Sequence, residues 1–312
     1  MSLFLGIDTS NYTTSAAVYD SDVNTVKNIG KLLPVAAGAK GLRQSDAVFL
    51  HTKALPDIVG EALKDADNIS AVGVTSSPRD MENSYMPCFL SGVAVASGIS
   101  SALKCPQYRF SHQRGHIAAA LFSVNRLDLL KKQFIAFHVS GGTTDAVLAV
   151  PNEELIIECR QIASTTDLNA GQLIDRVGVM LGLKFPAGPQ LEELAAESHS
   201  DIKVKPTLKD GCCCFSGVEN QCKKMFDSGV APSDIAKYTL DYIAVALEKM
   251  TDNLILNHGE LPLVFAGGVM SNKMIKNHLS NKFNCLFAKP QFSRDNAAGI
   301  AVLTSLKEGA VL

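Results

Sequence analysis

The chain has 312 residues, 46% of them hydrophobic and 19% charged, so it can bury a large core and is long enough for two lobes. Its formal net charge of -2 excludes a global basic field that would attract nucleic acid. Tryptophan is absent and aromatic residues make up only 6%, so any contact with RNA would depend on local lysine and arginine or on partner proteins.

The first predicted element is a hairpin. Apolar residues over 3–10 indicate a strand, small polar residues over 11–14 a turn, and apolar residues over 15–19 a return strand. The turn favours a phosphate contact, because it presents backbone N–H groups and hydroxyls with little side-chain bulk. Its candidate phosphate-loop residues are Asp8, Thr9, Ser10 and Asn11. Asp8 could also hold a metal ion, or the waters around one, near the phosphates.

A loop over 31–41 follows, and the rest of the first half is predicted as alternating helices and strands. The helix 46–64, interrupted by Pro56, precedes a strand over 69–75 and a turn over 76–80. A helix of small residues over 87–103, a strand over 108–110 and a helix over 111–122 complete this half.

The second half opens on a similar hairpin, with strands over 134–139 and 145–150 around a turn that contains Gly141 and Gly142. Further strands are predicted over 155–163, 263–266 and 285–288, and helices over 168–183, 190–197, 233–256, 271–279 and 296–306. The alternation indicates an α/β protein. Its repeated hairpins indicate a duplicated fold that grips a nucleotide between its halves, although an ordinary glycine hairpin would give the second turn the same sequence.

The eight cysteines and the N-terminus bear on location. No Cys-x-x-Cys pair occurs, and the adjacent cysteines 212–214 are poorly placed for three separate bridges. The chain starts directly with a strand, without a basic and apolar leader. We therefore expect a cytoplasmic protein with free thiols. Contact with a membrane is not expected, because the apolar stretch 93–103 is too short and too rich in serine and glycine to span a bilayer.

Two histidines, His112 and His116, are spaced four residues apart on a predicted helix. They share a face, which suits one metal ion, with Asp295 as a candidate third ligand. The residues between them include no glutamate that could activate water for a peptidase. The alternative is a pair of partly buried, hydrogen-bonded histidines.

Two further segments favour a ligand site. The turn 266–272 ends a strand and begins a helix, where glycines allow close approach of an anion or ribose. A tight packing turn would show the same residues. Asp175 lies on an amphipathic helix, where its simplest reading is a surface or capping charge.

Taken together, these motifs resemble the TsaD family of tRNA threonylcarbamoyl transferases, once called O-sialoglycoprotein endopeptidases, whose relatives include the catalytic subunit of the KEOPS complex. The likeness extends over almost the whole chain in the same order. It rests on the segments 6–10, 112–116, 139–142, 171–182, 186–189, 215–218, 266–272 and 295–298.

The resemblance implies an actin/hexokinase/Hsp70-like fold, with duplicated lobes, mixed β-sheets and flanking helices. Lobe I would comprise residues 1–109 and 291–312 and lobe II residues 110–290, with a ligand cleft between them. One divalent iron or zinc ion would be held by His112, His116 and Asp295. ATP, AMP or the carbamoyl-adenylate would contact His138, Val139, Ser140, Gly141, Gly142, Asp175, Gly188 and Asn272.

The implied reaction is metal-dependent transfer of threonylcarbamoyl from its adenylate to N6 of an adenosine in tRNA. Implied partners are tRNA, proteins of the modification machinery, and a second subunit in a homodimer or heterodimer. Three departures bear on it: Arg114 stands where the family has Glu, Thr143 where it usually has His, and residues 11–13 replace acidic positions. They leave the catalytic residues unassigned. The alternative is a non-catalytic nucleotide-binding paralogue that acts as a scaffold or regulator.

Overall fold

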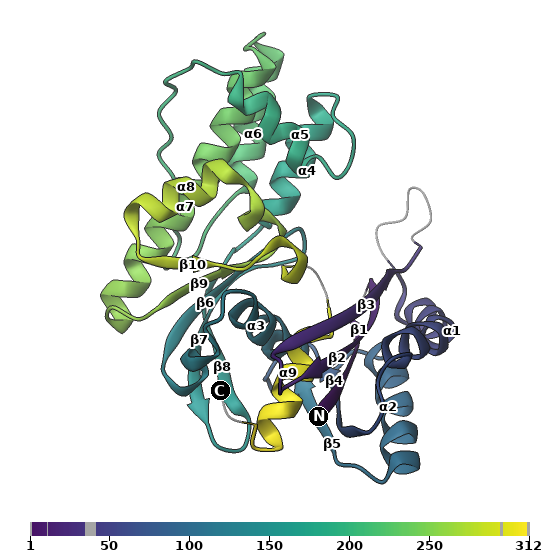
Figure 1. The fold of residues 1–312 in the computed structure, drawn as a ribbon. Coiled ribbons are helices and arrows are strands. Elements are labelled where there is room, and N and C mark those ends of the chain that lie inside the picture. The colour runs from purple at the N-terminus through teal and green to yellow at the C-terminus, as the bar shows by residue number, and fades with distance from the viewer. Residues whose placement is uncertain (1, 11, 35–41, 294–295, 311–312) are drawn as a thin grey trace. The chain divides into compact units, whose positions relative to one another are not determined.

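The computed structural model describes residues 2–10, 12–34, 42–293 and 296–310. The chain forms two compact units (Figure 1). The first contains Met1–Lys132, Ala149–Cys159 and Gln291–Leu312, and the second contains Gln133–Leu148 and Arg160–Pro290. The first unit extends past residue 109 because α3 (His112–Ser123) packs against α9 (Ala298–Lys307). A side chain on Gly299 would meet the backbone of Gly115, so these two helices touch through their glycines.

The first sheet has the order β3-β2-β1-β4-β5. The hairpin β1 (Leu3–Ser10) and β2 (Thr13–Asp20) is antiparallel, as the apolar strand, polar turn and apolar return strand predict, and β3 (Thr25–Leu32) continues it. β4 (Ile69–Ser77) and β5 (Gln107–Ser111) add in parallel on the other side. The sequence did not predict β3, because this edge strand is polar and largely exposed.

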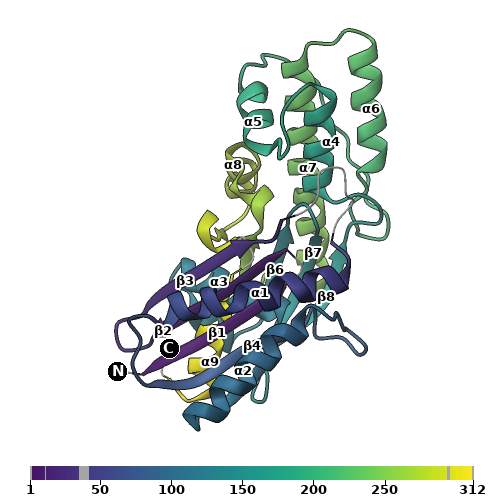
Figure 2. The same cartoon turned by 90° about the vertical axis from the view of Figure 1, so that its right-hand side faces the viewer.

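Helices cover both faces of this sheet. Leu3, Leu5 and Ile7 of β1 pack with α1 (Gln44–Leu63) and α2 (Phe89–Leu103), which lie along one face (Figure 2). Phe4 packs with α9 on the opposite face. All residues of β1 are buried, and their side chains alternate between two apolar layers, one on each face of the sheet. α1 is continuous through Pro56, where the sequence predicts an interruption.

The second sheet has the order β10-β9-β6-β7-β8, which repeats the first sheet's order in reverse. β6 (Phe134–Val139), β7 (Thr144–Asn152) and β8 (Ile156–Ser164) correspond to β1, β2 and β3. β9 (Leu263–Ala266) pairs in parallel with β6 and β10 (Cys285–Phe287), as β4 does with β1 and β5. The duplication indicated by the two hairpins is thus present in the strand order.

The second unit's core is mainly helical. α7 (Pro232–His258) contacts α4 (Ala170–Met180), α5 (Gly188–Ala196), α6 (Ser216–Asp227) and α8 (Lys273–Lys282). Short 3-10 helices span Leu127–Lys131, Gly268–Ser271 and Pro290–Phe292. All eight cysteines have free thiols, as expected. Within the described residues, no helix combines the length and apolar character that crossing a membrane requires.

Candidate functional site

The two predicted metal histidines face each other in the first unit. Ser111 caps α3 by accepting a hydrogen bond from the Arg114 amide, so the helix begins at His112 and His116 follows one turn later. Their Nε2 atoms are 2.8 Å apart, and their ring planes meet at 73°. The helix thus brings both imidazoles to one point, as the spacing predicts.

Asp8 orients the first of these imidazoles. Its buried carboxylate lies 3.3 Å from His112 Nδ1 and accepts a hydrogen bond of 2.7 Å from the Ser10 hydroxyl. A carboxylate at Nδ1 favours the tautomer with its proton there, which leaves the Nε2 lone pair directed toward His116. Asp8 therefore stands behind the ring, in the place of an outer-shell partner, and the geometry does not make it a ligand beside His116.

The described residues fit a divalent cation at this point. Metal–nitrogen distances of about 2.0–2.1 Å allow one ion to contact two nitrogens that lie 2.8 Å apart. The buried Thr75 hydroxyl, which has no hydrogen-bond partner, lies in β4, the strand that pairs with the strand of Asp8. Among the described residues no cluster of three or more His, Cys, Asp or Glu side chains forms a metal site. The expected third ligand, Asp295, lies outside them.

Arg114 turns away from the two imidazoles. Two residues along a helix correspond to about 200° of rotation, so its side chain leaves the opposite face of α3. There its guanidinium lies 2.8 and 2.9 Å from one carboxylate oxygen of Asp80. Arg114, which stands where the family has Glu, is thus paired with a carboxylate.

The other residues of the first turn are held by internal hydrogen bonds. The Thr9 hydroxyl donates to the Cys88 carbonyl, and Thr14 contacts Nδ1 of His51 at 2.8 Å. Burial lowers the pKa of His51 to about 4, against the opposing effect of the Asp8 charge. The sequence analysis missed this fully buried histidine, because one histidine on an apolar helix face gives no signal of its own. Asn11 lies outside the described residues.

In the second unit, the turn after β6 collects backbone donors. The amides of Gly142 and Thr143 point at the Ser140 hydroxyl, at 3.3 and 3.2 Å, and the Ser140 amide donates to the Thr143 carbonyl at 2.7 Å. A side chain added to Gly141 or Gly142 would meet open space. Successive amides that converge on one oxygen form the kind of concavity that binds an anion.

Two glycines let other segments approach this turn closely. A Cβ on Gly171, at the start of α4, would lie 2.6 Å from the Gly141 amide nitrogen. One on Gly267 would lie 2.3 Å from the Val139 carbonyl oxygen, and Gly267 also has a φ of +101°. His138 lies beside Ala266 through the pairing of β6 and β9. The structure thus brings the turn after β6 next to the beginning of the predicted turn 266–272.

The remaining predicted nucleotide contacts are tied together by α5. Asp175 accepts a hydrogen bond of 2.8 Å from the Ala187 amide, immediately before Gly188 begins the helix. Burial raises the pKa of Asp175, and this hydrogen bond opposes the rise. Asn272 caps α8, because its side-chain oxygen accepts a hydrogen bond of 3.0 Å from the Ile275 amide. The Lys273 amide donates to Glu192 of α5, which links α8 to the same helix.

Asp167 is a further residue that the sequence analysis missed. Its carboxylate accepts hydrogen bonds from the amides of Leu168, Phe215 and Ser216, and from the Ser216 hydroxyl at 2.5 Å. It thereby fixes the start of α6 (Ser216–Asp227), which the sequence analysis left without a helix. Phe215 and Ser216 lie 48 and 49 residues further along the chain, so sequence spacing carried no signal.

The stabilising effect of the Asp167 carboxylate at the start of α6 should depend on pH. Burial acts to raise the pKa of Asp167, but the hydrogen bonds from Phe215, Ser216 and Leu168 outweigh it and lower the pKa from 3.8 to about 2. A depressed pKa contributes stability above the unfolded value, which is lost as pH falls toward 2. Asp167→Asn should lower Tm at pH 7, and its difference from wild type should shrink between pH 4 and 2. Asp227→Asn, at the other end of α6, is the control; a pH-independent difference for Asp167→Asn would contradict the prediction.

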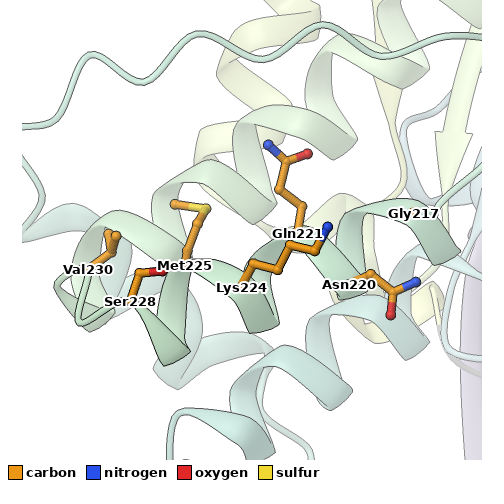
Figure 3. A pocket seen from close by; sticks show the side chains of 7 residues that line it. All are labelled: Gly217, Asn220, Gln221, Lys224, Met225, Ser228 and Val230. Atoms are coloured by element: carbon orange, nitrogen blue, oxygen red, sulfur yellow. The ribbon is translucent and has the colours of Figure 1, made fainter.

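A hollow of about 440 Å³ lies along α6 (Figure 3). Its lining is mostly polar and comes from one face of the helix and the turn after it: Gly217, Asn220, Gln221, Lys224, Met225, Ser228 and Val230. None of the predicted site residues lines it.

Solved structures with similar folds define the class. The chain matches component A of (R)-2-hydroxyglutaryl-CoA dehydratase from Acidaminococcus fermentans with a TM-score of 0.59 at 14% identity, covering 99% of each chain. It matches HypF from T. kodakarensis with a TM-score of 0.61 at 14% identity, over all of this chain and 48% of that one. It matches a ROK family glucokinase from Streptomyces griseus with a TM-score of 0.54 at 11% identity, covering 97% of this chain and 99% of that one. The chain therefore has the actin/hexokinase/Hsp70-type fold that the resemblance implied.

Sequence comparison identifies the family. The TsaD family, described as tRNA N6-adenosine threonylcarbamoyltransferase, matches residues 39–302. Two relatives carry the same description. The one from Nautilia profundicola is 30% identical over 96% of this chain and 91% of its own length. The one from Sulfurihydrogenibium sp. is 29% identical over 95% of this chain and 88% of its own length. The chain belongs to the TsaD family, as the motif order indicated.

Proposed function

We propose that this chain transfers a threonylcarbamoyl group from its adenylate to N6 of an adenosine in tRNA. The new bond joins N6 to the carbamoyl carbon, the bond from that carbon to the adenylate phosphate breaks, AMP leaves, and N6 gives up a proton. The observation that carries the proposal is the facing pair of imidazoles, His112 and His116, with Asp8 behind the first. A pair built only for packing would need no carboxylate to set its tautomer.

Residues of the first unit would hold the cation. His112 and His116 would be ligands through Nε2, Asp8 would orient His112, and Asp295 is proposed as the third ligand. A bound iron or zinc ion would supply Lewis-acid polarisation of the carbamoyl carbonyl. Arg114 does not oppose a cation at this place, because its charge is directed to Asp80 on the other face of α3.

Residues of the second unit would bind the adenylate. The converging amides of Gly142 and Thr143 support a phosphate contact in which a phosphate oxygen replaces the Ser140 hydroxyl. Asp175, Gly188 and Asn272 are proposed as contacts for ribose and base. The Asn272 side-chain oxygen already caps α8, so this residue would offer its amide nitrogen to the nucleotide.

The acceptor and the partners follow from the same proposal. tRNA would be the acceptor, proteins of the modification machinery would be partners, and a homodimer or heterodimer is the proposed assembly. The non-catalytic alternative is favoured by one observation: Thr143 offers its amide to the turn, at the position where the family usually places the ring of a histidine.

Direct assay of the product separates the two functions. Purified chain, threonylcarbamoyl-adenylate and unmodified tRNA should yield threonylcarbamoyl-adenosine, detected by mass spectrometry of digested nucleosides. Expression in a strain that lacks its own transferase should restore the modification. Binding of AMP by calorimetry without any product, with or without the strain's other modification proteins, would instead select the nucleotide-binding paralogue.

A further inference from the structure

Arg114 links three segments of the first unit. Its guanidinium contacts Asp80 in the segment after β4, and its Nη1 donates to the Leu155 carbonyl at 3.2 Å, in the turn before β8. Its backbone amide is bound by Ser111, the cap of α3. A side chain midway between two metal ligands is thereby fixed to residues 34 and 41 positions away in the sequence.

The segment that carries Asp80 forms a closed loop over 77–84. The Ser77 hydroxyl donates to the Arg79 carbonyl at 3.3 Å, and the Arg79 amide donates to the Ser84 hydroxyl at 3.1 Å. The loop is attached to α3 a second time, because the Gln113 amide donates to the Pro78 carbonyl at 3.1 Å. Gln113 and Arg114 directly follow His112, so this loop holds the turn that presents the first imidazole.

Both charges of the pair are buried. The side chain of Arg114 is 9% exposed and that of Asp80 is 7% exposed. Asp80 receives both contacts on Oδ1, and its buried Oδ2 has no hydrogen-bond partner. Removal of either partner leaves the other as an uncompensated charge in a poorly solvated place, so each side chain depends on the other.

We propose that Asp80 and Arg114 are a matched pair of positioning residues, which clamps the loop 77–84 onto α3 and so sets the angle at which His112 meets His116. The pair acts through the helix and does not touch the cation, and its effect on metal rests on the metal site of the proposed function. Arg114 replaces the family's Glu with a residue of opposite charge, and Asp80 supplies the carboxylate that balances it.

A reversal to the family's residue tests this directly. Arg114→Glu should weaken the metal site although it restores the family pattern, because the new carboxylate would face Asp80. Asp80→Arg alone should do the same by placing two guanidinium groups together. The double variant Arg114→Glu/Asp80→Arg recreates a pair of opposite charges and should recover most of the loss, which is the coupling that a double-mutant cycle measures.

The experiment measures three quantities for wild type, both single variants and the double variant. These are zinc affinity by competition with a chromophoric chelator, Tm, and hydrogen exchange of the 77–84 amides. We expect zinc affinity about tenfold weaker in each single variant, the scale of a lost outer-shell contact, together with faster exchange in the loop. The exposed pair Arg126–Asp128, which follows α3, supplies the control: the same exchange of charges there should leave zinc affinity unchanged.

Three results would overturn the proposal. Wild-type zinc affinity in folded Arg114→Glu contradicts the positioning role, and so does a double variant that recovers Tm without recovering zinc affinity. If the charge reversals do not fold, Arg114→Lys and Asp80→Asn replace them, and unchanged zinc affinity in both is decisive against it. Absence of zinc binding by wild type would contradict the proposed metal site itself, whereas unaltered affinity in the variants contradicts only the role of the pair.

Discussion

Replacement of His112 by alanine should abolish stoichiometric binding of zinc or iron. This variant removes one of two imidazole nitrogens that lie 2.8 Å apart, and the second histidine alone cannot hold a divalent ion against solvent. Bound metal per chain, measured by plasma mass spectrometry after desalting, should fall to background. His199→Ala is the matched control, because His199 is exposed and lies outside this group. Equal metal content in the two variants would end the claim.

A graded result should follow from Asp8→Asn. An amide at this position can still contact His112. It carries no negative charge, so it no longer holds the proton on Nδ1 or makes Nε2 more basic. We expect metal affinity to fall by roughly 10–100-fold, as for other outer-shell partners of metal-binding histidines. Tm measured with and without metal separates this effect from a general loss of folding. Affinity equal to wild type would contradict the role assigned to Asp8.

Gly267→Ala should be the most destabilising single substitution in the second unit's site. Its new Cβ would lie 2.3 Å from the carbonyl oxygen of Val139, and the φ of +101° is one that alanine rarely adopts. Backbone strain costs roughly 1–3 kcal/mol and overpacking against a rigid strand a similar amount. We expect a fall of about 3 kcal/mol in the free energy of unfolding, measured in urea.

The same variant should also lose nucleotide binding. Relief of the clash requires Val139 or Gly267 to move, and Val139 directly precedes the turn whose amides converge on Ser140. AMP affinity by calorimetry should fall by at least about tenfold, which corresponds to 1.4 kcal/mol. Gly60→Ala, in α1, is the control because its Cβ meets no atom within 4 Å. If the Gly267→Ala variant has the same free energy of unfolding and the same AMP affinity as the Gly60→Ala control, the close approach is refuted.

Much of the fold was predictable because its signals are local. The apolar runs of β1 and β2, the glycine turn after β6 and the four-residue spacing of His112 and His116 each need only neighbouring residues. Where local signals were weak, prediction failed. β3 is polar because it is an edge strand, and α6 starts at a cap supplied by Asp167 from far away in the sequence.

By itself, the sequence determined the α/β class, the duplicated hairpins and the family, because apolar runs, period-3.6 patterns and short glycine motifs are properties of neighbours along the chain. Only the tertiary structure decided that Asp8 lies behind His112, that Arg114 faces Asp80 and that Gly267 touches Val139. These contacts join strands and helices whose spacing in the chain is arbitrary. They depend on how sheets and helices pack, which no local pattern encodes.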